Sequence, residues 1–114
     1  MKIQQIQQIT EATIVCGTEQ QDRVATCAFA SDLMSDVLTL DCSGVVLITG
    51  LCNLQTIRTA EMAEIAYILF VRGKKATEEM IELARENGMV ILETNLSMYH
   101  TVGELYAHGL LPIY

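Results

Sequence analysis

Three of the seven basic residues of this chain stand close together, at Arg72, Lys74 and Lys75. They follow a fully apolar run, residues 66–71, which is typical of a strand buried on both faces of a sheet. Ligands of open parallel sheets bind beyond the carboxyl ends of the strands. The basic cluster therefore predicts a crevice for a phosphate or carboxylate group, and a solvated loop is the alternative interpretation.

Two further predicted strands, residues 45–49 and 89–93, end at the polar residues Thr49 and Glu93 and also lead toward helices. The N–H groups of a helix N-terminus favour anions, so these strand ends would add to the same crevice. Asn53 can cap the helix that follows the first of these runs, and Arg58 lies in the first turns of that helix. The residues expected to bind a ligand are Thr49, Gly50, Asn53, Arg58, Arg72, Gly73, Lys74 and Thr94.

Cys52 is the one residue with the setting of a possible nucleophile, because a thiol beside a helix N-terminus can have a lowered pKa. No histidine or other base stands near it in the sequence, so a buried, inert thiol is the favoured interpretation. The chain also lacks a Gly-x-Ser-x-Gly elbow, a dinucleotide-binding glycine pattern and a phosphate-binding Lys-Ser/Thr loop. We predict no catalytic residue and no cofactor.

A metal site is not expected either. His100 and His108 are eight residues apart, which is not the spacing of paired helical ligands. Asp22, Asp32 and Asp36 form a loose acidic group, but Asp32 is explained as a capping-region charge at the start of a helix. The acidic group is therefore weak evidence for a metal.

The elements that must position these residues alternate between helix and strand. Spacing and capping signals predict helices at 2–10, from Ser31 to about 40, after Asn53, from Thr77 to Gly88, and from Ser97 to His108. Strands are expected at 13–16, 24–30, 45–49, 66–71 and 89–93. Strands followed by helices indicate right-handed crossovers, and hence a single three-layer α/β domain over residues 1–114 with a mainly parallel sheet of about five strands.

Composition narrows the classes of partner. Of the 114 residues 51% are hydrophobic and 18% charged, which suggests apolar surface left for a homodimer. The net charge of -7 opposes binding to nucleic acid. No run approaches the roughly 20 apolar residues of a membrane span, and no signal peptide is seen, so we expect a cytoplasmic protein. The four cysteines contain no Cys-x-x-Cys pair and are expected to be free thiols.

Short motifs along nearly the whole chain resemble the DRTGG domain family and the N-terminal domain of HPr kinase/phosphorylase. They are Asp22-Arg23-Val24, the stretch from Ala30 to Leu38, Val46 to Gly50, Ile68 to Gly73, Glu93-Thr94 and Leu105-Tyr106. The family usually has Asp-Arg after the central strand's glycine, where this chain has Leu51-Cys52-Asn53, and Thr-Gly-Gly where it has Val71-Arg72-Gly73. If the family residues bind a ligand, these departures imply a different ligand or none.

The resemblance implies an α/β fold similar to the N-terminal domains of MurF-type ligases. It also implies a regulatory or dimer-forming role, because such modules occur beside CBS domains, in some pyrophosphatases and in long phosphotransacetylases. A kinase activity is not implied, since the phosphate-binding loop of HPr kinase lies in a separate domain. The expected function is a non-catalytic homodimeric module that senses a nucleotide or other anionic metabolite. The alternative is a docking module for a partner enzyme with no small-molecule ligand.

Overall fold

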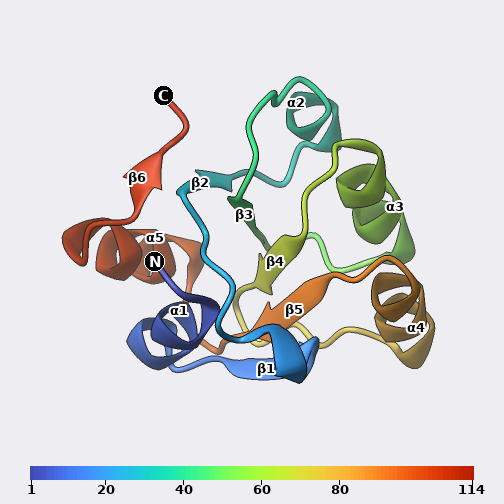
Figure 1. Ribbon diagram of the computed structural model, residues 1–114, viewed down its shortest axis with the longest axis horizontal. Coiled ribbons are helices and arrows are strands. Elements are labelled where there is room, and N and C mark those ends of the chain that lie inside the picture. The colour runs from blue at the N-terminus through green and yellow to red at the C-terminus, as the bar shows by residue number, and fades with distance from the viewer.

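The computed structural model describes residues 1–114, which form one six-stranded sheet in the order β1-β5-β4-β3-β2-β6 (Figure 1). The strands are β1 (Thr13–Cys16), β2 (Cys27–Ala30), β3 (Val45–Thr49), β4 (Tyr67–Phe70), β5 (Val90–Glu93) and β6 (Leu111–Pro112). Strands β2 to β5 are parallel to one another, β6 is parallel to β2, and only β1 is antiparallel, to β5. The predicted α/β fold with a mainly parallel sheet is confirmed.

Helices cover both faces of the sheet, which gives the expected three layers (Figure 1). Helices α2 (Met34–Val37), α3 (Leu54–Met62) and α4 (Glu78–Glu86) lie on one face, and α1 (Ile3–Thr10) and α5 (Met98–Ala107) on the other. A short 3-10 helix, η1 (Thr18–Gln20), follows β1. No helix has the length and apolar character needed to cross a membrane.

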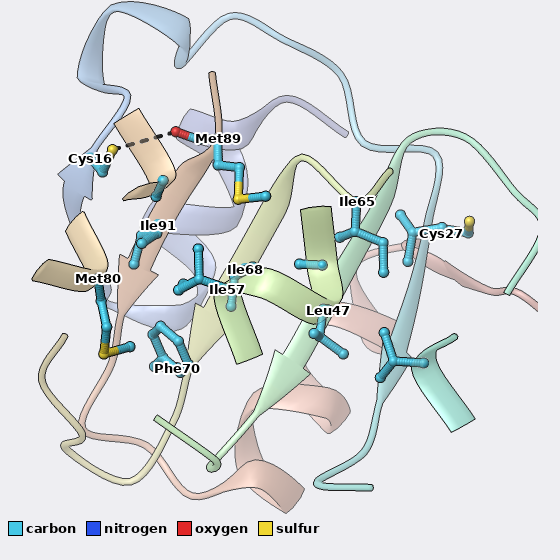
Figure 2. Packing of buried hydrophobic residues seen from close by; sticks show 14 residues of the cluster. Cys16, Cys27, Leu47, Ile57, Ile65, Ile68, Phe70, Met80, Met89 and Ile91 are labelled. Carbon is cyan, nitrogen blue, oxygen red and sulfur yellow. Dashed lines mark hydrogen bonds between the residues drawn. The ribbon is translucent and has the colours of Figure 1, made fainter. Parts of the chain in front are cut away.

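The alternating side chains of the central strands form two separate hydrophobic clusters. Leu47, Ile68 and Ile91 point to the α3 and α4 side, where they pack with buried residues of those helices (Figure 2). Val46 and Leu69 point the other way, toward the isoleucines of α1 and Leu105 of α5. Because both faces are covered, β3, β4 and β5 are buried at every position, as their continuous apolar runs predict.

The helix expected from Ser31 to residue 40 is wrong in extent, since α2 spans only Met34–Val37. The Ser31 hydroxyl oxygen accepts a hydrogen bond from the Leu33 N–H at 3.0 Å, which makes a local turn before the helix instead of a cap on it. Leu33 and Leu38 would share one face of the longer helix, but they remain 57% and 51% exposed. Asp32 is also not a capping-region charge, because its carboxylate is bound to the end of β3.

The sixth strand was not expected. Helix α5 ends at Ala107, one residue before the predicted end at His108, and Leu111 and Pro112 then pair with Cys27 and Ala28. A proline has no N–H to donate, and an edge strand tolerates it for that reason. Two residues are too few to show an alternating pattern, so the sequence carries no signal for β6.

All the parallel strands of the core end on the same side of the sheet. We call this side the carboxyl edge and define it by residues 31–32, 49–53, 71–75 and 93–95, the segments that follow β2, β3, β4 and β5. It holds all of the expected binding residues except Arg58. The candidate residues are therefore brought together because the parallel strands all end at this edge.

Candidate functional site

Asp32 anchors the carboxyl edge at the end of β2. Its Oδ1 accepts hydrogen bonds from the Thr49 hydroxyl at 2.9 Å and from the Gly50 N–H at 2.7 Å. The Gly50 N–H lowers the pKa of this carboxyl, and the Thr49 hydroxyl, the charge of Arg72 and the Leu51 N–H lower it further against a partial desolvation. Asp32 thus holds a negative charge across the β2 and β3 ends at neutral pH.

Arg72 lies directly over Gly50. A methyl carbon placed on Gly50 would come within 2.8 Å of one guanidinium nitrogen and 3.1 Å of Nε. The missing side chain at Gly50 is therefore what allows the guanidinium to lie against the β3 end. Arg72 itself is exposed, and its guanidinium makes no hydrogen bond or ion pair within the chain.

The backbone of Arg72 is in the left-handed region, with φ of 63°. Only Glu11 and Glu64 share this feature among non-glycine residues, and both follow the end of a helix, where it is common. Arg72 instead follows a strand, and its N–H donates to Leu96 O at 2.8 Å. Gly73, with φ of 72°, continues the turn and donates to Thr94 O at 2.9 Å. The turn thereby ties the ends of β4 and β5 together.

The two lysines of the cluster behave differently. Lys75 Nζ lies 3.7 Å from Glu93 Oε1, and the buried Glu93 also accepts from the Ala76 N–H at 2.7 Å. Lys74 is exposed, makes no ion pair, and lies near enough to Cys52 to act on its pKa. Arg72 and Lys74 are therefore the two cations of the edge that form no ion pair, although the charge of Arg72 acts on the nearby carboxylate of Asp32.

Cys52 does not have the lowered pKa that a helix N-terminus can produce. Burial raises the pKa of its thiol, the charge of Glu93 raises it further, and the charge of Lys74 only partly opposes this. The thiol also packs against the hydrophobic cluster on the α3 and α4 side. These contacts agree with the interpretation of Cys52 as an inert thiol.

Several expected binding residues have polar atoms that are already engaged. Asn53 caps α3, with its Oδ1 accepting from the Thr56 N–H at 2.9 Å and from the Thr56 hydroxyl at 3.1 Å. The Thr94 hydroxyl donates to Thr10 O at 2.6 Å and accepts from the Leu96 N–H at 3.2 Å. The Thr49 hydroxyl is satisfied in the same way, by Asp32 and the Leu51 N–H. These residues shape the loops on which the cations lie.

Arg58 is not brought to the carboxyl edge. It lines a hollow of about 240 Å³ between α3 and α4, together with Leu54, Leu83, Glu79, Glu82 and Glu86. Three of the residues that line this hollow with it are the acidic side chains of α4. The structure separates this residue from the other seven.

Asp32 is the residue of this edge that the sequence interpretation missed. Its partner Gly50 follows β3, and β2 runs parallel to β3 with Ala30 paired to Ile48. A polar residue just beyond one strand end therefore meets the residues just beyond the next. Assigning the predicted strand at 24–30 as the neighbour of β3 would have identified Asp32.

The histidines and the loose acidic group do not assemble into a site. His100 lies 3.8 Å from Glu104 on the exposed side of α5, and His108 contacts the Glu104 carbonyl oxygen. No group of three or more His, Cys, Asp or Glu side chains is arranged to hold a metal ion.

An apolar groove of about 200 Å³ lies on another side of the molecule, between α5, β2 and the C-terminal residues. Its lining residues are Ala28, Phe29, Ala30, Ile48, Val102, Leu105, Tyr106, Leu110, Pro112, Ile113 and Tyr114. The rings of Phe29 and Tyr114 contact each other at 6.4 Å between centroids. Tyr106, Leu111 and Tyr114 are at least 63% exposed in and beside it. Ten of its eleven lining residues are hydrophobic.

Comparison with known proteins gives one family and one fold. Residues 5–107 match the DRTGG domain family. The structure is similar, with a TM-score of 0.75, to a crystal structure of the CBS and DRTGG domains in the regulatory region of Clostridium perfringens pyrophosphatase, which is complexed with its activator, diadenosine tetraphosphate. The identity is 14%, and the match covers 98% of this chain and 48% of that one. No curated protein matches the sequence.

Proposed function

The chain belongs to the DRTGG domain family, and from this premise we propose that it is a non-catalytic regulatory module that senses a nucleotide or another anionic metabolite at its carboxyl edge. The observation that carries the proposal is the placement of Arg72 and Lys74. Both are exposed, neither forms an ion pair, and both lie beside the loop that leads from β3 into α3. Two such cations at the strand ends of a parallel sheet are suited to a phosphate group.

The conformation of Arg72 supports a role beyond folding. A side chain in the left-handed region costs roughly 1 kcal/mol, and glycine or asparagine would occupy it at lower cost. Because backbone strain gathers at functional sites, an arginine here suggests that the guanidinium is needed for an interaction outside the chain. Asp32 partly offsets this charge, but its Oδ1 is occupied by Thr49 and Gly50.

The similar pyrophosphatase region gives the class of ligand to test first. That region, which combines CBS and DRTGG domains, binds an activator with two adenosines joined by four phosphates. This chain spans about half of that length, so the whole protein's ligand is carried over here only as a proposal. Polyphosphate groups would suit Arg72 and Lys74, because a guanidinium can bind two phosphate oxygens at once.

The test is isothermal titration and thermal unfolding with AMP, ATP, diadenosine tetraphosphate and inorganic phosphate. We expect a saturable shift of several degrees with at least one nucleotide, since a ligand at a hundred times its Kd adds about 2.7 kcal/mol. The double variant Arg72→Asn with Lys74→Gln should lose at least ten-fold in affinity. Lys75→Gln and Arg58→Gln are matched charge controls and should keep the wild-type affinity. Equal losses in all variants, or no shift with any probe, would overturn the proposal.

The apolar groove favours a second element of the proposal, self-association. A homodimer in which two copies meet through α5 and the C-terminal residues would cover Tyr106, Leu111 and Tyr114. Light scattering on a sizing column should give twice the monomer mass for the wild type. The double variant Tyr106→Ser with Leu111→Ser should give the mass of one monomer. Met62→Gln is the control, because Met62 is 63% exposed on α3, away from the groove. A dimer insensitive to the double variant would place the interface elsewhere.

The same groove is the reason to keep a docking module as the alternative. In that case the chain binds no small molecule, and its apolar surface serves a partner enzyme as well as a second copy of the chain. A flat nucleotide panel at high concentrations would favour this alternative. A saturable nucleotide shift would exclude it.

A further inference from the structure

Two cysteines that are 15 residues apart in the sequence lie next to each other in space. The sulfur atoms of Cys27, the first residue of β2, and Cys42, in the loop before β3, are 3.4 Å apart. Cys27 is 6% exposed, whereas Cys42 is an exposed residue. A disulfide has a sulfur separation of about 2.05 Å, so a movement of little more than an ångström separates this contact from a bond.

The backbones that carry the two cysteines are held together independently of the sulfur atoms. The Thr26 N–H donates to Gly44 O at 2.8 Å, and the Thr26 hydroxyl donates to Ser43 O at 2.9 Å. Gly44 has a φ of 74°, and a methyl carbon on it would come within 2.7 Å of the Thr26 hydroxyl oxygen. The close approach of this loop to the start of β2 is thus built into the chain.

The other two cysteines cannot compete for this pairing. Cys16 lies on β1, which three strands separate from β2 in the sheet. Figure 2 shows Cys16 and Cys27 at opposite sides of the hydrophobic cluster. Cys52 follows β3 on the carboxyl edge, whereas Cys27 begins β2 at the opposite end of the sheet.

From this geometry we infer that Cys27 and Cys42 form a site of reversible oxidation, with an intramolecular disulfide as its product and glutathione disulfide as an oxidant of the right class. The Cys42 thiolate attacks one sulfur of glutathione disulfide and releases one glutathione. The Cys27 thiolate then attacks the Cys42 sulfur of the mixed disulfide and releases the second. Two thiols and one glutathione disulfide give one protein disulfide and two molecules of glutathione, which take up the two thiol protons.

The exposed cysteine is assigned the first step because glutathione disulfide can reach it. A hydrogen bond with Cys27 raises the pKa of Cys42, with desolvation and the charge of Asp41 acting in the same direction. The thiolate fraction at neutral pH is therefore small and the exchange slow. The site is accordingly examined at equilibrium with a glutathione redox buffer, not by its rate.

The closed loop would run from Cys27 to Cys42 and would contain β2, α2 and Asp32, the anchor of the carboxyl edge. Cross-linking a loop of about 15 residues restricts the unfolded chain and so stabilises the folded one. The midpoint temperature of thermal unfolding should therefore be roughly 10 °C higher for the oxidised protein. This expectation does not depend on any ligand, so it stands or falls separately from the proposed function.

The experiment equilibrates the intact protein in glutathione buffers of increasing oxidised fraction and then blocks free thiols with N-ethylmaleimide under denaturing conditions. The expected product is two daltons lighter before blocking, carries two labels instead of four, and yields a cross-linked peptide of Cys27 and Cys42. Cys42→Ser should abolish this product and the thermal shift. Cys52→Ser, the matched control, should retain both.

Two results would overturn the inference. One is a stable glutathione adduct on Cys42 with Cys27 still free, which would show that the second attack does not occur. The other is a protein that keeps four labels in the most oxidising buffer. Both are visible in the same mass spectra and need no folded variant, because they are read on the native chain.

Discussion

The turns after β3 and β5 are built in the same way but serve different parts of the molecule. In each, a buried threonine ends or follows the strand, and its hydroxyl oxygen accepts from the N–H two residues later, Leu51 at 3.1 Å and Leu96 at 3.2 Å. The hydroxyl protons go to different acceptors. Thr49 donates to the carboxylate of Asp32, and Thr94 donates to the backbone carbonyl of Thr10.

The acceptor decides what each turn does. The Thr94 bond is buried and joins β5 to the end of α1, so it holds one layer of the fold against the sheet. The Thr49 bond lies at the rim and fixes a charge beneath Arg72. The same local motif therefore holds α1 against the sheet at β5 and fixes the charge of Asp32 in the candidate site at β3. The comparison predicts that stability depends chiefly on Thr94 and that the charge pattern of the edge depends on Thr49.

The largest effect is expected from Thr94→Val, which keeps the shape and removes the hydroxyl. The Thr10 carbonyl and the Leu96 N–H would lose their partner, and an unsatisfied buried group costs about 1–3 kcal/mol. We expect the free energy of unfolding in urea to fall by about 3 kcal/mol. Thr94→Ser keeps the hydroxyl and should lose less than half of that; equal losses would mean that the methyl group, not the hydrogen bonds, matters.

Thr49→Val should cost less, about 1–2 kcal/mol, because Asp32 is solvent-exposed and can turn to water while still accepting from the Gly50 N–H. Urea denaturation beside Thr94→Val measures the difference directly. If both valine variants lose the same free energy, the distinction between the two turns is wrong.

Asp32→Asn sharpens the comparison through pH. The amide oxygen can accept the same two bonds, so only the charge is lost, and for an exposed group we expect less than about 1 kcal/mol at pH 7. The folded pKa of Asp32 is lowered, so its stabilisation is present above the unfolded pKa of about 3.9 and is lost as pH falls through the folded pKa. The difference in unfolding free energy between wild type and variant should shrink from pH 7 to pH 3, and a constant difference would contradict this.

The smallest effect on folding is expected from Arg72→Asn. Asparagine tolerates the left-handed backbone better than arginine, so the unfolding free energy should stay the same or rise by about 0.5 kcal/mol. Arg72→Gln removes the same charge but keeps the backbone cost, which makes it the matched control and the less stable of the two. A clear loss of stability in Arg72→Asn would show that the guanidinium holds the fold together.

Sequence patterns predicted the layers and the strand polarity because the buried strands are continuous apolar runs bounded by glycine or polar residues. The same patterns correctly predicted that six of the eight expected site residues lie at the strand ends and that Asn53 caps a helix. The position of Arg58 could not be predicted, since its place beside α4 depends on how α3 and α4 pack. The short α2 was missed because the Ser31 hydroxyl competes for the local backbone, and Asp32 because its partner is 18 residues away.

The antiparallel strand β1 imposes an order in time on the folding of the chain. Ile14 pairs with Leu92, so β1 must wait for β5 before it has a partner. At a synthesis rate of 5–20 residues per second the interval is roughly 4 to 16 s. Ile3 and Ile6 of α1, which end up fully buried, wait longer still for Leu105 of α5, which belongs to the same hydrophobic cluster. The N-terminal segment is therefore among the last parts of the nascent chain to be covered, although it is among the best packed in the finished fold.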